Sequence, residues 1–400
     1  MTVRLGRTLP PAVAPIGVAN IAHGFAAMFS GDNATGLFAR QLQAYFKVKH
    51  CFLLSSGKAS LLLILQALKT MHPDRDEVLI PAFTCYSVPA AIVRAGLKVR
   101  ICDIEPETLD FDYCELAEQL SCPRLLCVIP THFFGVTADV AKVREMIGSR
   151  DVAIIEDAAQ SMGAQCNGRL VGTLGDVGFF SLGRGKAFST VAGGIILTDS
   201  AEIGSLLEKH YTAVTTCSIT EQLIMAMYAV ALTVLTRPWL FWIPSSLPFL
   251  GLGETHYEPG FPVKKMSAFQ AGLADAWQDR LMQLRSIRQR NADYLQKSGV
   301  TVAVGAKLLA SAPIRFPTLV ASRVEQQSVL WGSNRSGLGG ADAYPGTVDT
   351  IAALQGCIVG GTSEKARSVV ERIVTFPVHP GVTRKDIHKI AALLHDPKIH

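Results

Sequence analysis

The sequence predicts an α/β protein in which a large domain with a mostly parallel sheet precedes a smaller C-terminal α+β domain. Short apolar runs bounded by glycine and acidic residues are typical of strands buried on both faces of a sheet. These runs alternate with helical patterns at short intervals, as they do in doubly wound sheets. The composition changes from Ser267 onward, and 400 residues are enough for two domains. We therefore expect a large domain over 1–258 and a small one over 259–400.

The expected large domain begins with an arm rich in glycine, proline and alanine over 1–35 and a helical pattern over 33–46. Strand and helix patterns then follow one another. The expected strands cover 51–55, 78–82, 99–103, 125–130, 152–155, 177–182 and 193–198. The expected helices cover 59–68, 87–95, 113–120 and 140–147. This alternation is what favours a parallel sheet over an antiparallel one.

The expected small domain opens with one long helical pattern over 267–297, which carries its charges on one side. Strands are expected at 300–304 and 314–320, and the segments 369–376 and 384–394 complete an α+β arrangement. The boundary with the large domain is expected in the His-Tyr-Glu-Pro-Gly-Phe-Pro stretch that begins at His256.

Composition excludes several classes of protein. The net charge of +5 is mild, and no stripe of Lys and Arg interleaved with aromatic residues occurs, so no nucleic-acid partner is expected. The nine cysteines are scattered without a C-x-x-C pair, which indicates reduced thiols rather than disulfides or a metal site. The first residues contain prolines and lack the apolar core of a signal peptide. We therefore expect a cytoplasmic protein.

The segment 222–253 is an apolar insertion in the large domain. Neither of its halves, divided at Arg237-Pro238, reaches the ~20 residues that a membrane-spanning helix requires. One interpretation is a buried helix and an apolar loop at an oligomer interface. The alternative is a peripheral contact with the inner face of the membrane, with Trp239 and Trp242 at headgroup depth, or a lid over a lipid-like substrate.

The stretch 153–199 carries the residues that point to chemistry. Asp157 follows one expected strand and Lys186 follows another, so both can meet at one edge of the sheet, where α/β proteins bind ligands. A desolvated lysine is an amine nucleophile that forms a Schiff base with an aldehyde cofactor. Pyridoxal 5′-phosphate (PLP) needs such a lysine, an acid for its ring nitrogen and a phosphate cup.

A phosphate cup is available where Ser56 and Gly57 open a strongly apolar helix, because the first N–H groups of a helix bind anions. Ser181 can contribute a hydroxyl. The full Walker pattern is absent, which excludes a P-loop nucleotide site, and no G-x-G-x-x-G joins a strand to a helix, which disfavours a dinucleotide site.

The order of short motifs resembles that of the DegT/DnrJ/EryC1/StrS sugar aminotransferases, a family of fold-type I PLP-dependent enzymes. The most specific combination is E-D-A-A-Q at 156–160 followed by F-S-x4-K ending at Lys186. The others are S-G-K-A-S-L at 56–61, P-A-F-T-C at 81–85, H-F-F-G at 132–135, G-D at 175–176, G-G at 193–194 and M-S-A-F-Q-A-G-L at 266–273. Fold type I is what this resemblance implies for the large domain.

The resemblance also implies a role for each site residue. Lys186 would be the Schiff-base lysine and the acid/base of the reaction, and Asp157 would hold the pyridinium nitrogen. Gln160 would touch the phenolic oxygen of the cofactor, and Ser181 would hold its phosphate.

The backbone at Ser56 and Gly57 would complete the phosphate site. Lys58 replaces the usual threonine and would add charge there or point into solvent. Cys85 stands where an aromatic side chain usually stacks on the ring, so Tyr86 beside it is expected to stack instead.

The resemblance implies a homodimeric aminotransferase that moves an amino group, with glutamate as donor, to a keto or aldehydo group of a nucleotide-linked sugar for surface polysaccharide. One alternative is a membrane-associated transaminase acting on an apolar or lipid-linked carbonyl compound. Another is a non-catalytic regulatory or scaffold protein with the PLP fold, which Lys186 argues against. A histidine at this position would favour a 3-dehydratase.

Overall fold

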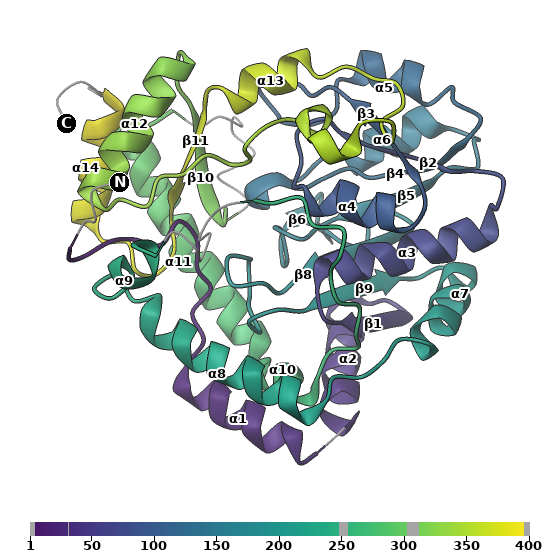
Figure 1. The fold of residues 1–400 in the computed structure, drawn as a ribbon, viewed down its shortest axis with the longest axis horizontal. Coiled ribbons are helices and arrows are strands. Elements are labelled where there is room, and N and C mark those ends of the chain that lie inside the picture. The colour runs from purple at the N-terminus through teal and green to yellow at the C-terminus, as the bar shows by residue number, and fades with distance from the viewer. Residues whose placement is uncertain (1–4, 31, 248–254, 302–311, 396–400) are drawn as a thin grey trace.

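A seven-stranded sheet with the order β1-β9-β8-β5-β4-β2-β3 forms the centre of the molecule (Figure 1). The computed structural model describes residues 5–30, 32–247, 255–301 and 312–395. The strands of the sheet are β1 (His50–Leu54), β2 (Glu77–Pro81), β3 (Lys98–Cys102), β4 (Leu125–Val128), β5 (Ala153–Asp157), β8 (Val177–Ser181) and β9 (Gly194–Thr198). Only β9 runs antiparallel to its neighbours, and the pairs from β8 to β3 are parallel. The predicted mostly parallel sheet is therefore confirmed.

Helices cover both faces of this sheet. Val78 and Ile80 of β2 pack in one cluster with α3, α4 and α7, whereas Leu79 between them packs with α5 and α6. Successive strand residues point to opposite faces, so both faces are buried, which explains the continuous apolar runs. The helices of the large domain are α1 (Val18–Met28), α2 (Asp32–Phe46), α3 (Gly57–Met71), α4 (Ser87–Arg94), α5 (Tyr113–Gln119), α6 (Val140–Ile147), α7 (Ala201–Thr212), α8 (Ile219–Leu235) and α9 (Trp242–Ser245). A small hairpin, β6 (Gln165–Cys166) with β7 (Arg169–Leu170), stands apart from the sheet.

The helical pattern over 267–297 is two helices, not the single one predicted: α10 (Ala268–Leu273) and α11 (Trp277–Lys297). Ala276 between them has a φ of 51°, which interrupts a right-handed helix. The change of direction lets α10 lie against α1, where a Cβ on Gly272 would come within 2.5 Å of a carbonyl oxygen of α1. It also places Trp277 in the core. No proline or glycine lies at 274–276, so the break depends on packing that the periodicity does not show.

From residue 312 onward, the C-terminal part forms a smaller unit of two strands and three α-helices among the described residues. They are β10 (Arg315–Leu319), β11 (Ile373–Pro377), α12 (Arg323–Ser336), α13 (Glu364–Val370) and α14 (Arg384–His395). The strand expected at 314–320 is confirmed by β10, whereas 302–304 of the strand expected at 300–304 lie outside the described residues. The domain boundary at 258/259 stays a prediction. Lys265, beyond it, still bridges Leu54 of β1, and α10 packs on α1.

The apolar segment 222–253 contains most of α8 and the short α9, and its last residues, 248–253, lie outside the described residues. Ala226 and Ala229 of α8 are buried in a cluster with Ile21 of α1 and Phe269 of α10. In Figure 1, α8 runs beside α1 and α10. Its outer side exposes the large apolar residues Ile219, Leu223, Ile224, Met227, Val230 and Val234. No helix among the described residues has the length and apolar character that crossing a bilayer requires.

Candidate active site

The carboxyl ends of β1, β5 and β8 meet around a cavity of about 210 Å³. Asp157 is the last residue of β5, Ser181 is the last residue of β8, and Ser56 follows β1 by two residues. Parallel strands end at one edge of their sheet, which is the reason these distant positions come together. Seven of the eight predicted site residues line the cavity: Ser56, Gly57, Lys58, Asp157, Gln160, Ser181 and Lys186. The eighth, Tyr86, does not.

Asp157 is the buried acid of the cavity. Its side chain is almost inaccessible to solvent, and Oδ1 accepts a hydrogen bond of 3.0 Å from the backbone N–H of Ala159. Burial raises the pKa of Asp157, although the Ala159 hydrogen bond and the positive charge of Lys186 act in the opposite direction. The carboxyl group therefore sits where a cationic partner would strongly favour its ionised form.

Lys186 lies in the loop between β8 and β9, and a buried arginine fixes this loop. Arg288 of α11 donates Nη2 to the carbonyl oxygen of Lys186 (3.0 Å) and Nη1 to that of Ala187 (2.7 Å). Nη2 also reaches the carbonyl oxygen of Val13 in the N-terminal arm (3.3 Å). Burial lowers the pKa of Arg288 to about 10, which still leaves it charged at neutral pH. The sequence pattern did not identify this residue, because it lies in a run of similar arginines on one helix.

The start of α3 forms the cup beside Ser181. The hydroxyl of Ser56 accepts a hydrogen bond from the N–H of Ala59 (3.1 Å) and so caps the helix. The N–H groups of the first turn, including those of Gly57 and Lys58, have no carbonyl within the helix to accept them. A Cβ on Gly57 would lie 3.0 Å from the Cβ of Ser181, so glycine at this position makes room for the close approach. An anion here meets N–H groups, a hydroxyl and the positive end of the helix dipole.

Lys58 lines the cavity, but its ammonium group is already paired. Nζ lies 2.9 Å from Oε2 of Glu258, and it also lies over the ring of Phe261. Glu258 is largely exposed, so this ion pair stands at the rim of the cavity, where water screens it. The proposed contribution of Lys58 to phosphate binding stays a prediction, and it would compete with Glu258.

Gln160 connects the large domain to the C-terminal part. Its Oε1 accepts the N–H of Phe134 (3.0 Å), which orients the amide so that Nε2 donates to the hydroxyl oxygen of Tyr344 (2.9 Å). Burial raises the pKa of Tyr344 well above its ordinary value, so its proton remains available to a ligand in the cavity. Tyr344 was missed from the sequence, because a single tyrosine in an irregular segment carries no pattern.

The structure places Cys85, not Tyr86, at the cavity. The side chain of Tyr86 is buried on another side, where it forms a hydrogen bond with Thr350. This placement gives no support to the predicted stacking of Tyr86 on a cofactor ring. Thr84 and Thr131 also line the cavity, and their buried hydroxyl groups have no hydrogen-bond partner among the described residues. Buried hydroxyls without partners are costly, so these two mark positions that a bound polar group would satisfy.

Glu156 and His132, both within the motifs, are structural. Ala138 donates its N–H to Nδ1 of His132 (2.8 Å), so the ring proton lies on Nε2, which donates to Glu156 (2.8 Å). Glu156 also accepts the N–H groups of Gly172, Leu174 and Gly175. Burial alone would raise the pKa of Glu156, but these donors hold it below its usual value. Neither residue lines the cavity.

We expect Glu156→Gln to lower the free energy of unfolding by about 3 kcal/mol, because the new amide NH₂ would face buried N–H donors. Urea denaturation measures this loss, and Glu145→Gln on the exposed side of α6 is the matched control. A variant with unchanged stability but a large loss of activity would contradict the structural role.

No group of three or more His, Cys, Asp or Glu residues suited to a metal ion occurs in the described part of the chain. All nine cysteines are free thiols.

Comparison with known proteins finds a matching family model and several similar curated proteins. The model of the DegT/DnrJ/EryC1/StrS aminotransferase family matches residues 22–395. A similar curated protein is the L-glutamine:2-deoxy-scyllo-inosose aminotransferase of Streptoalloteichus tenebrarius, 33% identical over 44% of this chain and 41% of its own length. Another is the GDP-perosamine synthase of Vibrio cholerae, 29% identical over 41% of this chain and 44% of its own length. The chain thus spans less than half the length of these relatives.

A solved structure extends the likeness to the complete fold. The E. coli GDP-4-keto-6-deoxy-D-mannose-3-dehydratase with bound hydrated PLP has a TM-score of 0.74 and 19% identity, covering 98% of this chain and 100% of that one. At this identity the likeness concerns the fold, and it confirms the predicted fold-type I class.

Proposed function

Because this chain belongs to the DegT/DnrJ/EryC1/StrS aminotransferase family, we propose that it is a PLP-dependent aminotransferase. Its acceptor is a keto or aldehydo group of a nucleotide-linked sugar, its donor is glutamate, and its product enters surface polysaccharide assembly. One observation carries the proposal. Lys186 and Asp157 share a cavity with an anion cup formed by Gly57 and Ser181.

The cavity fits the cofactor in three respects. The N–H groups at the start of α3 and the hydroxyl of Ser181 suit a phosphate. The buried carboxyl of Asp157, with its raised pKa, suits a protonated ring nitrogen, whose charge would favour the ionised acid. The hydroxyls of Thr84 and Thr131 have no hydrogen-bond partner among the residues that the structure describes, so they leave polar groups for a ligand to satisfy.

When bound, PLP supplies an aldehyde carbon and an electron-withdrawing pyridinium ring. Lys186 would bind that carbon and, once displaced by the donor amine, would move the proton that transamination shifts. Asp157 would keep the ring nitrogen protonated. Ser56, Gly57 and Ser181 would hold the phosphate. Gln160 would face the phenolic oxygen, and we add Tyr344, whose hydroxyl it orients.

Lysine at position 186 separates this proposal from its nearest rival. Dehydratases share the fold, as the solved E. coli structure shows. A lysine can form a covalent bond with an aldehyde, whereas a histidine in its place can act only as an acid or base. We therefore favour amino transfer over dehydration. A non-catalytic scaffold would have no need of a buried acid beside this lysine.

The test is the visible spectrum of the purified protein, followed by amino transfer from ¹⁵N-glutamate to a panel of nucleotide-linked keto sugars, measured by mass spectrometry. We expect a visible PLP band, bleaching with glutamate, and a gain of ¹⁵N in one acceptor. Light scattering on the same preparation should give the mass of the proposed homodimer. A colourless protein that takes up no PLP would overturn the proposal. A PLP band without amino transfer from any donor would favour the regulatory alternative.

A further inference from the structure

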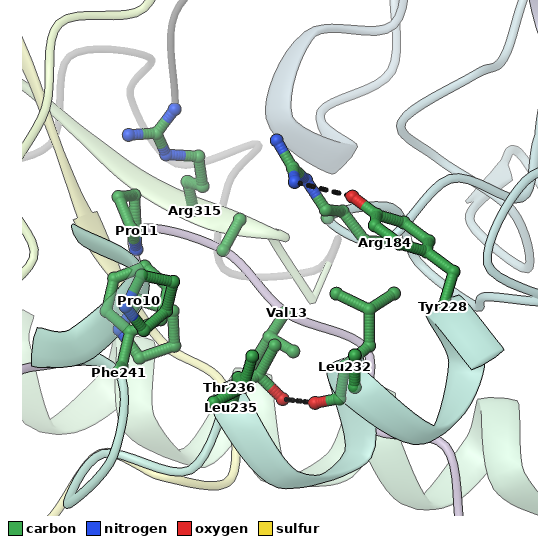
Figure 2. Close-up of a pocket in the computed structure, with 14 residues that line it drawn as sticks. Pro10, Pro11, Val13, Arg184, Tyr228, Leu232, Leu235, Thr236, Phe241 and Arg315 are labelled. Carbon is green, nitrogen blue, oxygen red and sulfur yellow. Dashed lines mark hydrogen bonds between the residues drawn. The ribbon is translucent and has the colours of Figure 1, made fainter. Parts of the chain in front are cut away.

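A second cavity, of about 270 Å³, borders the loop that carries Lys186. The N-terminal arm from Pro10 to Val13 and one face of α8 enclose it, and Arg184 and Gly185 belong to its wall (Figure 2). Gly185 packs against Ala12 of the arm, and the N–H of Ala14 donates to the carbonyl oxygen of Arg184 (2.8 Å). The arm and the loop are thus joined beside the cavity, two residues from Lys186.

The wall formed by α8 is apolar. Tyr228, Leu232 and Leu235 recur at helical spacing on the side that faces the cavity, and Phe241 and Pro244 continue this surface. The few hydroxyls are engaged: Thr236 donates to the carbonyl oxygen of Leu232 (2.6 Å), and Tyr228 accepts from Arg184 (3.3 Å). Such a lining suits a chain of carbon atoms and offers a nucleotide base or ribose few hydrogen-bond partners.

Two guanidinium groups supply the charge at this cavity, and no Asp or Glu is among its described lining residues. Figure 2 shows Arg184 and Arg315 along one side and the α8 residues Leu232 and Leu235 along the other. The Nε and Nη2 atoms of Arg315 are buried and have no hydrogen-bond partner within the described part of the chain.

Arg315 therefore stands as a buried cation with two unused donors. Burial lowers its pKa to about 10, against the opposing charge of Asp342, so it remains charged at neutral pH. A buried donor without an acceptor is unfavourable, and a guanidinium donates best to a planar or tetrahedral anion.

We propose that this cavity binds an anionic amphiphile, whose apolar chain lies along α8 and whose carboxylate or phosphate pairs with Arg315. The volume lies just below the ~300 Å³ at which sites for small molecules begin, which suits one chain and not a complete nucleotide sugar. This ligand is additional to the proposed transamination, and its binding does not depend on that chemistry.

The exposed side of α8 provides a matched control for this site. Ala231 lines the cavity, whereas Val234 is 42% exposed on the outer side of the same helix. Ala231→Trp fills the cavity, and Val234→Trp adds comparable apolar bulk outside it. An amphiphile that only adsorbs to the outer apolar surface of α8 should not lose affinity for the Ala231→Trp variant while it keeps its affinity for the Val234→Trp variant.

The experiment displaces a dansyl-labelled undecanoate from the full-length holoenzyme with dodecanoate, dodecyl phosphate or dodecanol, each below its micelle concentration. Saturable displacement of the probe by either anion supports the site. Tighter binding of dodecanoate would indicate a carboxylate ligand, and tighter binding of dodecyl phosphate would indicate a phosphate ligand. We expect Ala231→Trp to abolish binding and Val234→Trp to retain it. We expect Arg315→Gln to weaken anion binding by about tenfold while dodecanol is unaffected. Arg184→Gln serves as a second variant if Arg315→Gln does not fold.

The failure of this inference is distinguishable from the failure of the proposed function. Lys186→Ala should keep the amphiphile affinity while it loses the PLP band. Equal binding by the Ala231→Trp variant and the unmodified protein would overturn the inference and indicate adsorption to the outer surface of α8. Binding only to vesicles of anionic phospholipid would do the same. If glutamate displaced the labelled probe at concentrations as low as those needed for dodecanoate, the inference would also be overturned. Arg315 would then bind the carboxylate of the amino donor.

Discussion

Replacement of Lys186 by alanine is expected to remove the visible PLP band and to lower kcat by about 10⁴-fold, because the variant loses both the amine nucleophile and the group that moves the proton. The fold should persist. The loop is held through the backbone of residue 186, whose N–H donates to Gly183 and whose carbonyl oxygen accepts from Arg288, and alanine keeps both hydrogen bonds. Absorbance, steady-state kinetics and thermal unfolding measure the three effects.

The matched control for this prediction is Lys142→Ala. Lys142 is an exposed lysine of α6 that pairs with Glu145, so its loss should change neither the spectrum nor the rate. Lys186→Arg keeps a positive charge without the nucleophile and should resemble the alanine variant. If either variant of Lys186 retained the visible band, the cofactor would be bound elsewhere, and the assignment of Lys186 would be wrong.

Asp157→Asn is expected to separate catalysis from stability. The asparagine oxygen can still accept the N–H of Ala159, so the end of β5 should keep its shape. Loss of the negative charge beside the ring nitrogen should lower kcat/KM by about 10²–10³-fold, the size of a lost electrostatic contact in a dry active site. The visible band should remain, because Lys186 is intact. A variant with normal kinetics would remove Asp157 from the proposed mechanism.

The same substitution should stabilise the cofactor-free protein at neutral pH. Burial raises the pKa of Asp157 above its ordinary value of 3.8, so the folded chain binds this proton more tightly than the unfolded chain. Stability contributed by the protonated acid is therefore present at low pH and is lost as the pH rises from the unfolded pKa through the raised folded pKa. Urea denaturation from pH 4 to 8 should show the unmodified protein losing stability relative to Asp157→Asn across that interval. Parallel curves would contradict the burial argument, and the exposed Asp74→Asn is the control.

The sequence determined where the central chemistry stands. Asp157 and Ser181 end neighbouring parallel strands, and Ser56 caps the helix that follows β1, so the strand pattern alone brings them to one edge of the sheet. Short continuous apolar runs identified these strands, because each strand is buried on both faces. The spacing from Ser181 to Lys186 then leaves the lysine close to the same edge. A local sequence pattern is therefore enough to place a site residue when that residue stands at the end of a predicted strand.

Tertiary structure decided which of these residues are free to act. Glu258 pairs with the ammonium group of Lys58, and Tyr344 accepts a hydrogen bond from the amide of Gln160, although these partners lie 200 and 184 residues away in the sequence. Cys85 lines the cavity, whereas its neighbour Tyr86 points away from it. The backbone at the start of α4 sets these directions, and the type of residue does not.

The second cavity and the break before α11 have the same origin. Arg315 lies beside α8 and the N-terminal arm only after three distant segments pack together, and the turn at Ala276 exists because α10 fits against α1. The sequence by itself therefore determined the strand ends and the cofactor residues that they carry. Contacts between distant segments decided the pairing of their side chains, the support of the Lys186 loop by Arg288 and the charged apolar cavity beside it, because such contacts depend on packing that no local period encodes.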